Sequence, residues 1–285
     1  MGCHRVADER SPTLRRRELA RRLRHLRGDR TIQEVADSLG LTAPTISRIE
    51  TGARLATRRN VVALCDLYGV DDALRARLLQ LAREASQQGW WNEFDDLAID
   101  PLIGLEIEAI RISSYESSVI PWIFQTKEYA RAVIKGDLPL IESKILDERV
   151  DARITRQQIL TRESAPQFLS LVDDSAINRV VGGVKVMSAQ LLRMVELARI
   201  PNVTLQIVPF ELGAHPGLNT TFTILEFMDP QPPVVYVESK AGGLYLERRS
   251  DFERFEEVMM RLRAGALDPD RSVRKIREAA RNFGS

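Results

Sequence analysis

The segment TIQEVADSLGLTAPTISRIETG, residues 31–52, decides the fold of the N-terminal part of the chain. Thr31 can cap a helix, and Glu34 three residues later completes a capping box. Gly40 ends that helix with a positive φ angle. Thr42 then caps a second short helix, whose apolar spacing turns one side inward. Two short helices around one glycine turn form a helix-turn-helix pattern.

Further amphipathic helices surround this pair. Residues 13–27 carry an apolar stripe at helical spacing, with arginine on the remaining surface. Two more helices are predicted at residues 61–68 and 73–85. The three stripes consist of Leu19, Leu23 and Leu26, of Val62, Leu64 and Leu67, and of Leu74, Leu78 and Leu81. Residues 13–88 therefore predict an all-α head of five helices, preceded by a flexible N-terminus at residues 1–12.

Charge is unevenly distributed along the 285 residues. Residues 1–88 contain 17 arginines and 11 acidic residues, which gives 17 − 11 = +6. The remainder contains 24 basic and 29 acidic residues, 24 − 29 = −5, so the two parts sum to the net charge of +1. A basic head on an acidic body indicates that the head meets a polyanion such as nucleic acid. A solvated arginine-rich surface is the alternative interpretation of the charge alone.

The helix-turn-helix residues also carry a family resemblance. Residues 36–52, ADSLGLTAPTISRIETG, resemble the helix-turn-helix of phage-repressor-like bacterial regulators, the Cro/C1 or xenobiotic-response-element (XRE) family. The resemblance implies a lambda-repressor-like fold whose third helix enters the major groove of double-stranded DNA. It also implies that Arg27 pairs with Glu50 and ties the third helix to the first. It places Ala43, Pro44, Thr45 and Arg48 in the groove, and Thr31 and the start of the third helix at Thr42 near phosphates. We expect further DNA contacts from Ser47, Arg54 and Arg58.

A polar segment separates the head from the rest of the chain. SQQGWWNEFDD, which begins at Ser86, interrupts the helical period with a glycine, polar residues and two adjacent tryptophans. We expect a linker at residues 89–100, docked by Trp90 and Trp91, and a second domain at residues 101–285.

The second domain is predicted to be α/β. FLSLVDD (168–174) and NVTLQIVPF (202–210) are predicted strands, and a helix is predicted between them at residues 188–199. This order is a βαβ unit with parallel strands. TTFTILEF (220–227) and PVVYVES (233–239) predict an antiparallel pair. Together these strands predict a small mixed sheet.

Helices are predicted around this sheet. Three apolar residues at helical spacing predict a helix near the start of the domain: Leu105, Ala109 and Ile112. Residues 142–163 contain no Gly or Pro and predict a long charged helix. Residues 250–267 and 272–283 predict two closing helices, the second capped by Ser272.

The body carries a second resemblance, which runs in order from about Leu105 to Leu267. Segments such as YESSVIPWIFQTKEYARA, DERVDARITRQ and NVTLQIVPFELGAHPGL are similar to the body of actinobacterial regulators of the Scr1 antitoxin-like class, a domain of unknown function of the DUF5753 type. The resemblance implies a transcription regulator. It also implies that the body binds a small acidic protein encoded nearby. A small-molecule effector is the alternative partner of the body.

A Gly- and Pro-rich loop, ELGAHPGLN (211–219), lies between two predicted strands, where binding residues tend to cluster. We expect His215, with Phe210 and Asn219, to form part of a ligand or partner surface. Trp122, in the segment PWIF, is assigned to the same surface. A histidine that only caps a turn is the alternative interpretation of His215.

The best enzymatic alternative is a metal-dependent nuclease. Glu238 and Lys240 fall on one side of a predicted strand, and Asp173, Asp174 or Asp229 could supply a second carboxylate. Such enzymes need two carboxylates to hold Mg²⁺ and a lysine to stabilise the charge of the attacked phosphate. We expect instead a regulator without catalytic residues, metal site or cofactor. A protein that binds other proteins and no DNA is the remaining alternative.

The chain is expected to be a cytoplasmic homodimer. It is 44% hydrophobic, its first residues lack an apolar region, and no run of about 18 uncharged apolar residues follows. Ala43, Pro44 and Thr45 offer few base contacts, so one recognition helix is too weak to select an operator. Two heads joined by a dimeric body sum both interfaces.

Overall fold

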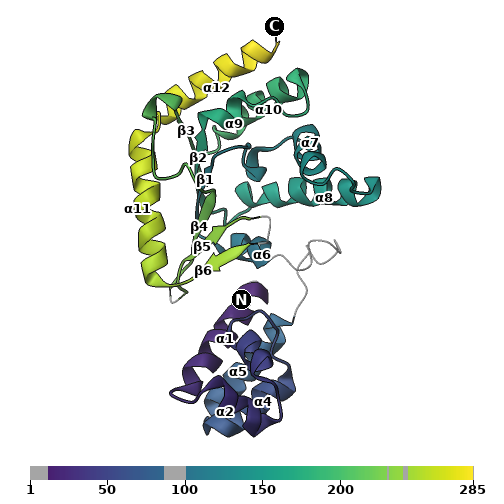
Figure 1. Cartoon of the computed structure of the whole chain (residues 1–285), viewed down its shortest axis with the longest axis vertical. Coiled ribbons are helices and arrows are strands. Elements are labelled where there is room, and N and C mark those ends of the chain that lie inside the picture. Colours follow the sequence, from purple (N-terminus) through teal and green to yellow (C-terminus); the bar gives the residue numbers. More distant parts are fainter. Residues whose placement is uncertain (1–11, 87–100, 230, 240–242, 285) are drawn as a thin grey trace, which may run out of the picture. The chain divides into compact units, whose positions relative to one another are not determined.

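The computed structural model describes residues 12–86, 101–229, 231–239 and 243–284 (Figure 1). By their contacts these residues form two compact units, a helical head and a body of sheet and helices. Helix α6 (Pro101–Glu108) contacts α1 and belongs to the head. The predicted linker and its two tryptophans lie outside the described residues, as does all of the predicted N-terminus except Pro12. No described helix is both long and apolar enough to span a bilayer.

The head is a bundle of short helices that share one core. The helices are α1 (Pro12–Arg27), α2 (Ile32–Leu39), α3 (Ala43–Glu50), α4 (Arg58–Tyr68) and α5 (Asp72–Ala85). The apolar stripes predicted from the sequence meet inside, where Leu19, Leu23, Ile46, Leu64 and Leu78 are almost fully buried. Burial of each such side chain contributes about 1.5–3 kcal/mol, which holds helices too short to be stable alone.

The helix caps and the turn predicted around α2 and α3 are mostly present. The Thr31 hydroxyl accepts from the Glu34 N–H, the Glu34 carboxylate accepts from the Thr31 N–H at 2.7 Å, and Gly40 has φ 62°. Thr42 holds the cap position of α3, but the prediction that its side chain caps the helix is wrong. Pro44 has no N–H to offer, and the Thr45 N–H already donates to the Thr42 carbonyl at 2.8 Å.

The body is built on a six-stranded sheet with the order β3-β2-β1-β4-β5-β6. Its strands are β1 (Arg111–Glu116), β2 (Gln167–Asp173), β3 (Val203–Val208), β4 (Phe222–Glu226), β5 (Val234–Val237) and β6 (Leu244–Leu246). β1, β2 and β3 run parallel, whereas β4, β5 and β6 each run antiparallel to the preceding neighbour in the sheet. The predicted parallel pair and the predicted antiparallel pair are both confirmed, as is the α/β class.

The helices cover the two faces of this sheet unequally (Figure 1). α11 (Arg249–Gly265) lies on one face and shares a core with the sheet around Tyr115, Leu171, Phe222 and Leu262. The helices on the other side are α7 (Lys127–Asp137), α8 (Ser143–Arg156), α9 (Asp174–Asn178) and α10 (Val184–Leu197). α12 (Pro269–Gly284) packs on α10 and on β3.

The connection between α11 and α12 covers the free edge of β3. The Ile207 N–H donates to the Ser272 hydroxyl at 2.9 Å, and the Ile207 carbonyl accepts from the Leu267 N–H at 2.8 Å. Asp268, not Ser272, caps α12, because its carboxylate accepts from the Arg271 N–H. The prediction that Ser272 caps this helix is therefore wrong. Its buried hydroxyl instead accepts from the edge strand β3, which would otherwise expose unpaired backbone groups.

The sequence prediction misses β1, a central strand of the sheet. The spacing that ends at Ile112 predicts a helix, but α6 ends at Glu108 and Ile112 lies in β1. Two serines occupy the middle of the strand, and the Ser114 hydroxyl donates to the Ser170 hydroxyl across to β2 at 3.2 Å. Serine is neither apolar nor a strong strand former, so this buried strand lacks both an apolar run and an alternating pattern.

The predicted helix over 142–163 is also too long. α8 ends at Arg156, and Gln157–Leu160 form a 3₁₀ turn. The Gln157 amide donates to the carbonyls of Trp122 and Gln125, at 3.0 and 2.7 Å. These contacts come from a segment distant in sequence. The local pattern of charged and apolar residues therefore could not predict them or the end of α8.

Candidate nucleic-acid interface

Helix α3 has one buried and one accessible side. Ile46 and Ile49 point into the core of the head. Pro44 and Arg48 are exposed on the other side, and Ala43, Thr45 and Ser47 are half-buried there. Arg48 is the only long donor among these five, because the Thr45 hydroxyl is shared with Thr42 at 2.9 Å and proline and alanine offer no donor group. The Arg48 Nε donates to the Pro44 carbonyl at 3.2 Å, which holds the guanidinium along this side of α3.

Two further arginines flank the C-terminal end of α3. Arg54 lies in the turn after α3, where its N–H donates to the Arg48 carbonyl at 2.8 Å, and Arg58 is the first residue of α4. Both side chains are exposed. Within the described part of the head, Arg48, Arg54 and Arg58 have no ion pair with an acidic side chain. Their charge is thus available to an external anion.

Thr31 and Thr42 lie at the N-terminal ends of α2 and α3, and both are exposed. The first N–H groups of a helix have no partner within the helix and carry partial positive charge. These two residues therefore stand where the resemblance assigns contacts with phosphate.

An ion pair locks α3 onto α1. The Arg27 Nε donates to both Glu50 carboxylate oxygens, at 2.9 and 3.1 Å, across 23 residues of sequence. The Glu50 side chain is 4% exposed and that of Arg27 is 17% exposed. The Arg27 guanidinium also donates to the Arg30 carbonyl. This is the pairing that the resemblance implies, and it fixes the orientation of the accessible side of α3.

Tyr68, at the end of α4, lies against this pair. Burial, together with the charge of Glu50, raises the pKa of the Tyr68 phenol to about 12. The Arg30 guanidinium lies over the Tyr68 ring at 5.7 Å from its centroid. Three helices thus meet at one partly buried charged cluster, which the sequence signals only through the Arg27 and Glu50 positions.

The four body residues predicted to bind a ligand or partner lie in two loops. Trp122 begins a 3₁₀ turn, Trp122–Phe124, after β1, and the other three follow β3 in or beyond the turn Phe210–Leu212. Because β1 and β3 are parallel, both loops emerge at the carboxyl edge of the sheet, where open α/β sheets bind ligands. Phe210 is 59% exposed and Asn219 is exposed. Trp122 is half-buried under Arg156, whose guanidinium carbon lies 4.0 Å from the ring centroid.

His215 is more enclosed than the others. Its side chain is 5% exposed, and Nε2 lies 3.6 Å from the Asp173 carboxylate. Nδ1 accepts from the Gly217 N–H at 3.2 Å, and the ring meets the edge of Tyr115 at a centroid distance of 5.9 Å. These contacts pin the loop to the ends of β1 and β2. They match the turn-capping interpretation of His215.

Two family models match the chain. Residues 18–78 match a model described as a helix-turn-helix domain, and residues 99–278 match one described as a domain of unknown function, DUF5753. The chain belongs to the DUF5753 family. The helix-turn-helix head and the DUF5753-type body expected from the sequence are confirmed, and the head supports a DNA-binding regulator. No curated protein and no solved structure is found to match the chain.

The DUF5753 domain does not assemble the predicted nuclease residues in its described part. Glu238 follows β5, whereas Asp229 follows β4 and lies at the opposite edge of the sheet, because the two strands are antiparallel. Asp173 ends β2, three strands from β5, which is about 14 Å by strand spacing. Asp174 is paired with the Lys275 ammonium at 2.6 Å. Lys240 lies outside the described residues.

Sequence reasoning misses another carboxylate of the DUF5753 domain, Glu116 at the end of β1. Burial and the nearby Glu238 raise the pKa of Glu116 to about 8, while Arg153 acts in the opposite direction. Burial in turn lowers the pKa of Arg153 to about 10. The sequence would indicate Glu116 as an acidic residue at the end of a central strand. Because β1 is not predicted from the sequence, Glu116 is missed. Within the described ranges no three His, Cys, Asp or Glu side chains are placed to hold a metal ion.

Proposed function

We propose that this protein is a sequence-specific transcription regulator of the cytoplasm, which reads an operator with α3 as a homodimer. The observation that carries the proposal is the set of three exposed arginines beside an oriented α3. Arg48 projects from the helix itself, and Arg54 and Arg58 follow it, none with an ion pair to a described acidic residue. Phosphate contacts position such a head, and base contacts select the sequence.

Arg48 is expected to contact a base, whereas Arg54 and Arg58 are expected to contact phosphates. Arg48 is the long donor on α3, so it is assigned to a base edge, where one good contact discriminates by about 1–3 kcal/mol. Arg54 and Arg58 lie outside α3 and are assigned to phosphates, together with the exposed helix starts at Thr31 and Thr42. Because α3 begins with Ala43 and Pro44, base contacts per head are few. A dimer supplies the remaining specificity.

Titration of the full chain with a selected operator and with a scrambled duplex tests this assignment. Arg48→Ala should weaken operator binding about 5- to 100-fold and scrambled-duplex binding much less. Arg54→Ala and Arg58→Ala should weaken binding to both duplexes. Each should also reduce the slope of log K against log salt concentration by about one. Arg77→Ala, which removes another exposed charge of the head, from α5, is the matched control. Equal losses on both duplexes for Arg48→Ala would refute base recognition by this residue.

The body is assigned a second role, as the receiver of a signal from a small protein encoded nearby or from a small molecule. The support is the exposure of Phe210 and Asn219 in the connection between β3 and β4, at the edge of the sheet where open α/β sheets bind ligands. Calorimetry of the full chain with the neighbouring gene product is the test. Phe210→Ala should lower the affinity at least tenfold, whereas Met228→Ala, 70% exposed beyond the other end of β4, should not. Equal effects would place the partner elsewhere.

A further inference from the structure

One face of the body sheet is covered by a single described helix. α11 contains 17 residues and is therefore about 25 Å long but only about 10 Å wide, whereas β1, β2 and β3, with six or seven residues each, are about 20–23 Å long. α11 contacts β3, β4 and β5. It cannot shield the whole length of β1, β2 and β3, and the N-terminal halves of these three strands lie beside it.

A groove of about 380 Å³ occupies this uncovered area. Its floor includes Ser113, Leu169 and Thr204, which are register partners on β1, β2 and β3. Met259 and Met260 of α11 form part of one wall. Met260 is 60% exposed, which is unusual for a large apolar side chain beside a groove.

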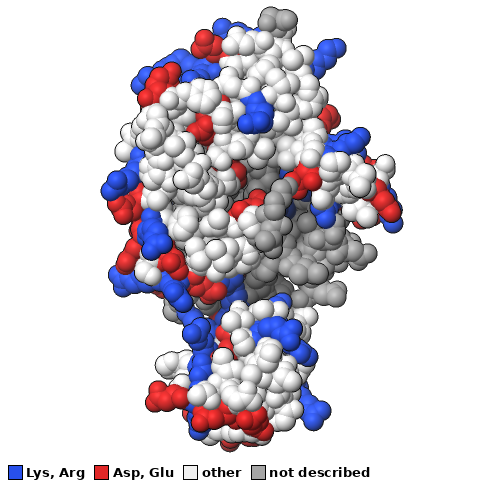
Figure 2. Space-filling model, in the orientation of Figure 1, with Lys and Arg blue, Asp and Glu red and all other residues white. Residues whose placement is uncertain are grey.

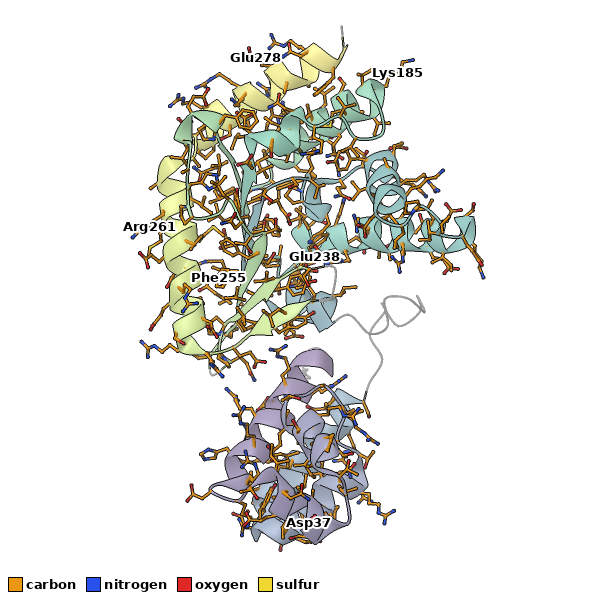
Figure 3. All side chains as sticks on the ribbon, viewed as in Figure 1. Asp37, Lys185, Glu238, Phe255, Arg261 and Glu278 are labelled. Carbon is orange, nitrogen blue, oxygen red and sulfur yellow. The ribbon has the colours of Figure 1, made fainter. Side chains whose placement is uncertain are left out.

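The flank of α11 that borders the groove carries two charges that have no ion-pair partner among the described residues. Glu256, Met260 and Arg263 follow one another at helical spacing, and all three line the groove. Glu256 and Arg263 are exposed, and no described residue forms an ion pair with either. Toward the start of the helix the same stripe carries the ion pair of Arg249 with Glu253, and on the adjacent outer side Arg261 pairs with Glu257. Phe255 lies on the sheet side of the same helix and Arg261 on its outer side (Figure 3).

The order of these charges is self-complementary. Glu256 and Arg263 are seven residues apart, or about 10 Å along the helix. A two-fold axis at their midpoint would place Glu256 opposite Arg263 of the partner subunit, twice over, with the exposed Met260 of each copy between the two ion pairs. The rim of the groove also holds Arg111 and Glu226, so its formal charge is zero. On this side of the body acidic and basic side chains are interspersed rather than separated (Figure 2).

We propose that this flank of α11 and the groove beside it form the dimer interface, in which α11 packs antiparallel on α11 of a second copy of the chain. An isologous interface requires one patch to complement itself, and a patch with equal numbers of acids and bases around the exposed, apolar Met260 does so. A patch of a single charge sign would instead favour a different partner. The inference rests on the proposed homodimer and locates its contact on the face opposite to α7–α10.

Sedimentation equilibrium of the full chain, without DNA, tests the interface through charge reversal. Glu256→Arg places two arginines opposite each other in both ion pairs, and Arg263→Glu places two glutamates there, so each variant alone should raise the dimer Kd at least tenfold. A mixture of the two variants restores both ion pairs and should form a heterodimer with nearly the wild-type Kd. Glu257→Arg, which reverses a neighbouring charge on the other flank, is the matched control and should leave the Kd within about twofold.

The outcomes separate the interface from the proposed function. A wild-type chain that stays monomeric would overturn both the homodimer and this interface. A dimer that neither reversal weakens would overturn the interface and leave the homodimer standing, as would variants that fail to dimerise with each other. Both positions are exposed, so far-UV circular dichroism should be unchanged and weak binding to a scrambled duplex at low salt should persist.

Discussion

Replacing Glu50 by alanine removes the acceptor that holds α3 on α1. The variant leaves the Arg27 guanidinium partly buried, with the Arg30 carbonyl as its remaining described acceptor. Breaking a buried ion pair by deleting one partner costs about 3–5 kcal/mol. Because Arg27 keeps some water and one carbonyl, we expect about 2–3 kcal/mol. For a domain of this size that loss corresponds to a drop in melting temperature of about 10–20 °C.

Hydrogen exchange of the α2 and α3 amides in the full chain measures this loss in the head alone. Asp66→Ala is the matched control, because Asp66 pairs with Arg75 at the exposed surface of the same head and should cost less than about 1 kcal/mol. The double variant Arg27→Met/Glu50→Leu should recover most of the stability, since no buried charge remains. The reasoning is refuted if Glu50→Ala and Asp66→Ala destabilise α2 and α3 equally.

Three further changes test other parts of the structure. Gly40→Ala forces a side chain into a left-handed conformation, φ 62°, and should lower the stability of the head by about 1–2 kcal/mol in denaturant titrations. Ser272→Ala leaves the buried Ile207 N–H without its acceptor and should cost the body about 1–3 kcal/mol, measured in the same way. The folded-state pKa of Glu116, about 8, lies above its unfolded value, so the folded state retains the proton longer and stability falls as pH rises from about 4.5 to 8. Glu116→Gln should therefore raise the melting temperature of the body at pH 8.5 and change it little at pH 4, and equal shifts at both values would contradict this.

The sequence by itself determined the head. The capping box at Thr31, the left-handed Gly40 and the buried Ile46 and Ile49 are signals between residues a few positions apart, so local chemistry predicts α2, the turn and α3. The parallel strands β2 and β3 were predictable for the same reason, because each is a short apolar run bounded by turn residues. The prediction that Thr42 caps α3 with its side chain still failed. Pro44 has no N–H, and the Thr45 N–H donates to the Thr42 carbonyl instead of the hydroxyl.

Only the tertiary structure decided the rest. β1 is a central strand in which the Ser114 hydroxyl bonds to Ser170 of β2, and nothing in its own six residues indicates a strand. Ser272 looks like a helix cap in sequence but completes the edge of β3, 65 residues away. Glu116 becomes unusual only when the chain buries it near Glu238, more than a hundred residues later. In each case the partner is distant in sequence, and the free energy of a contact depends on which groups the fold brings together.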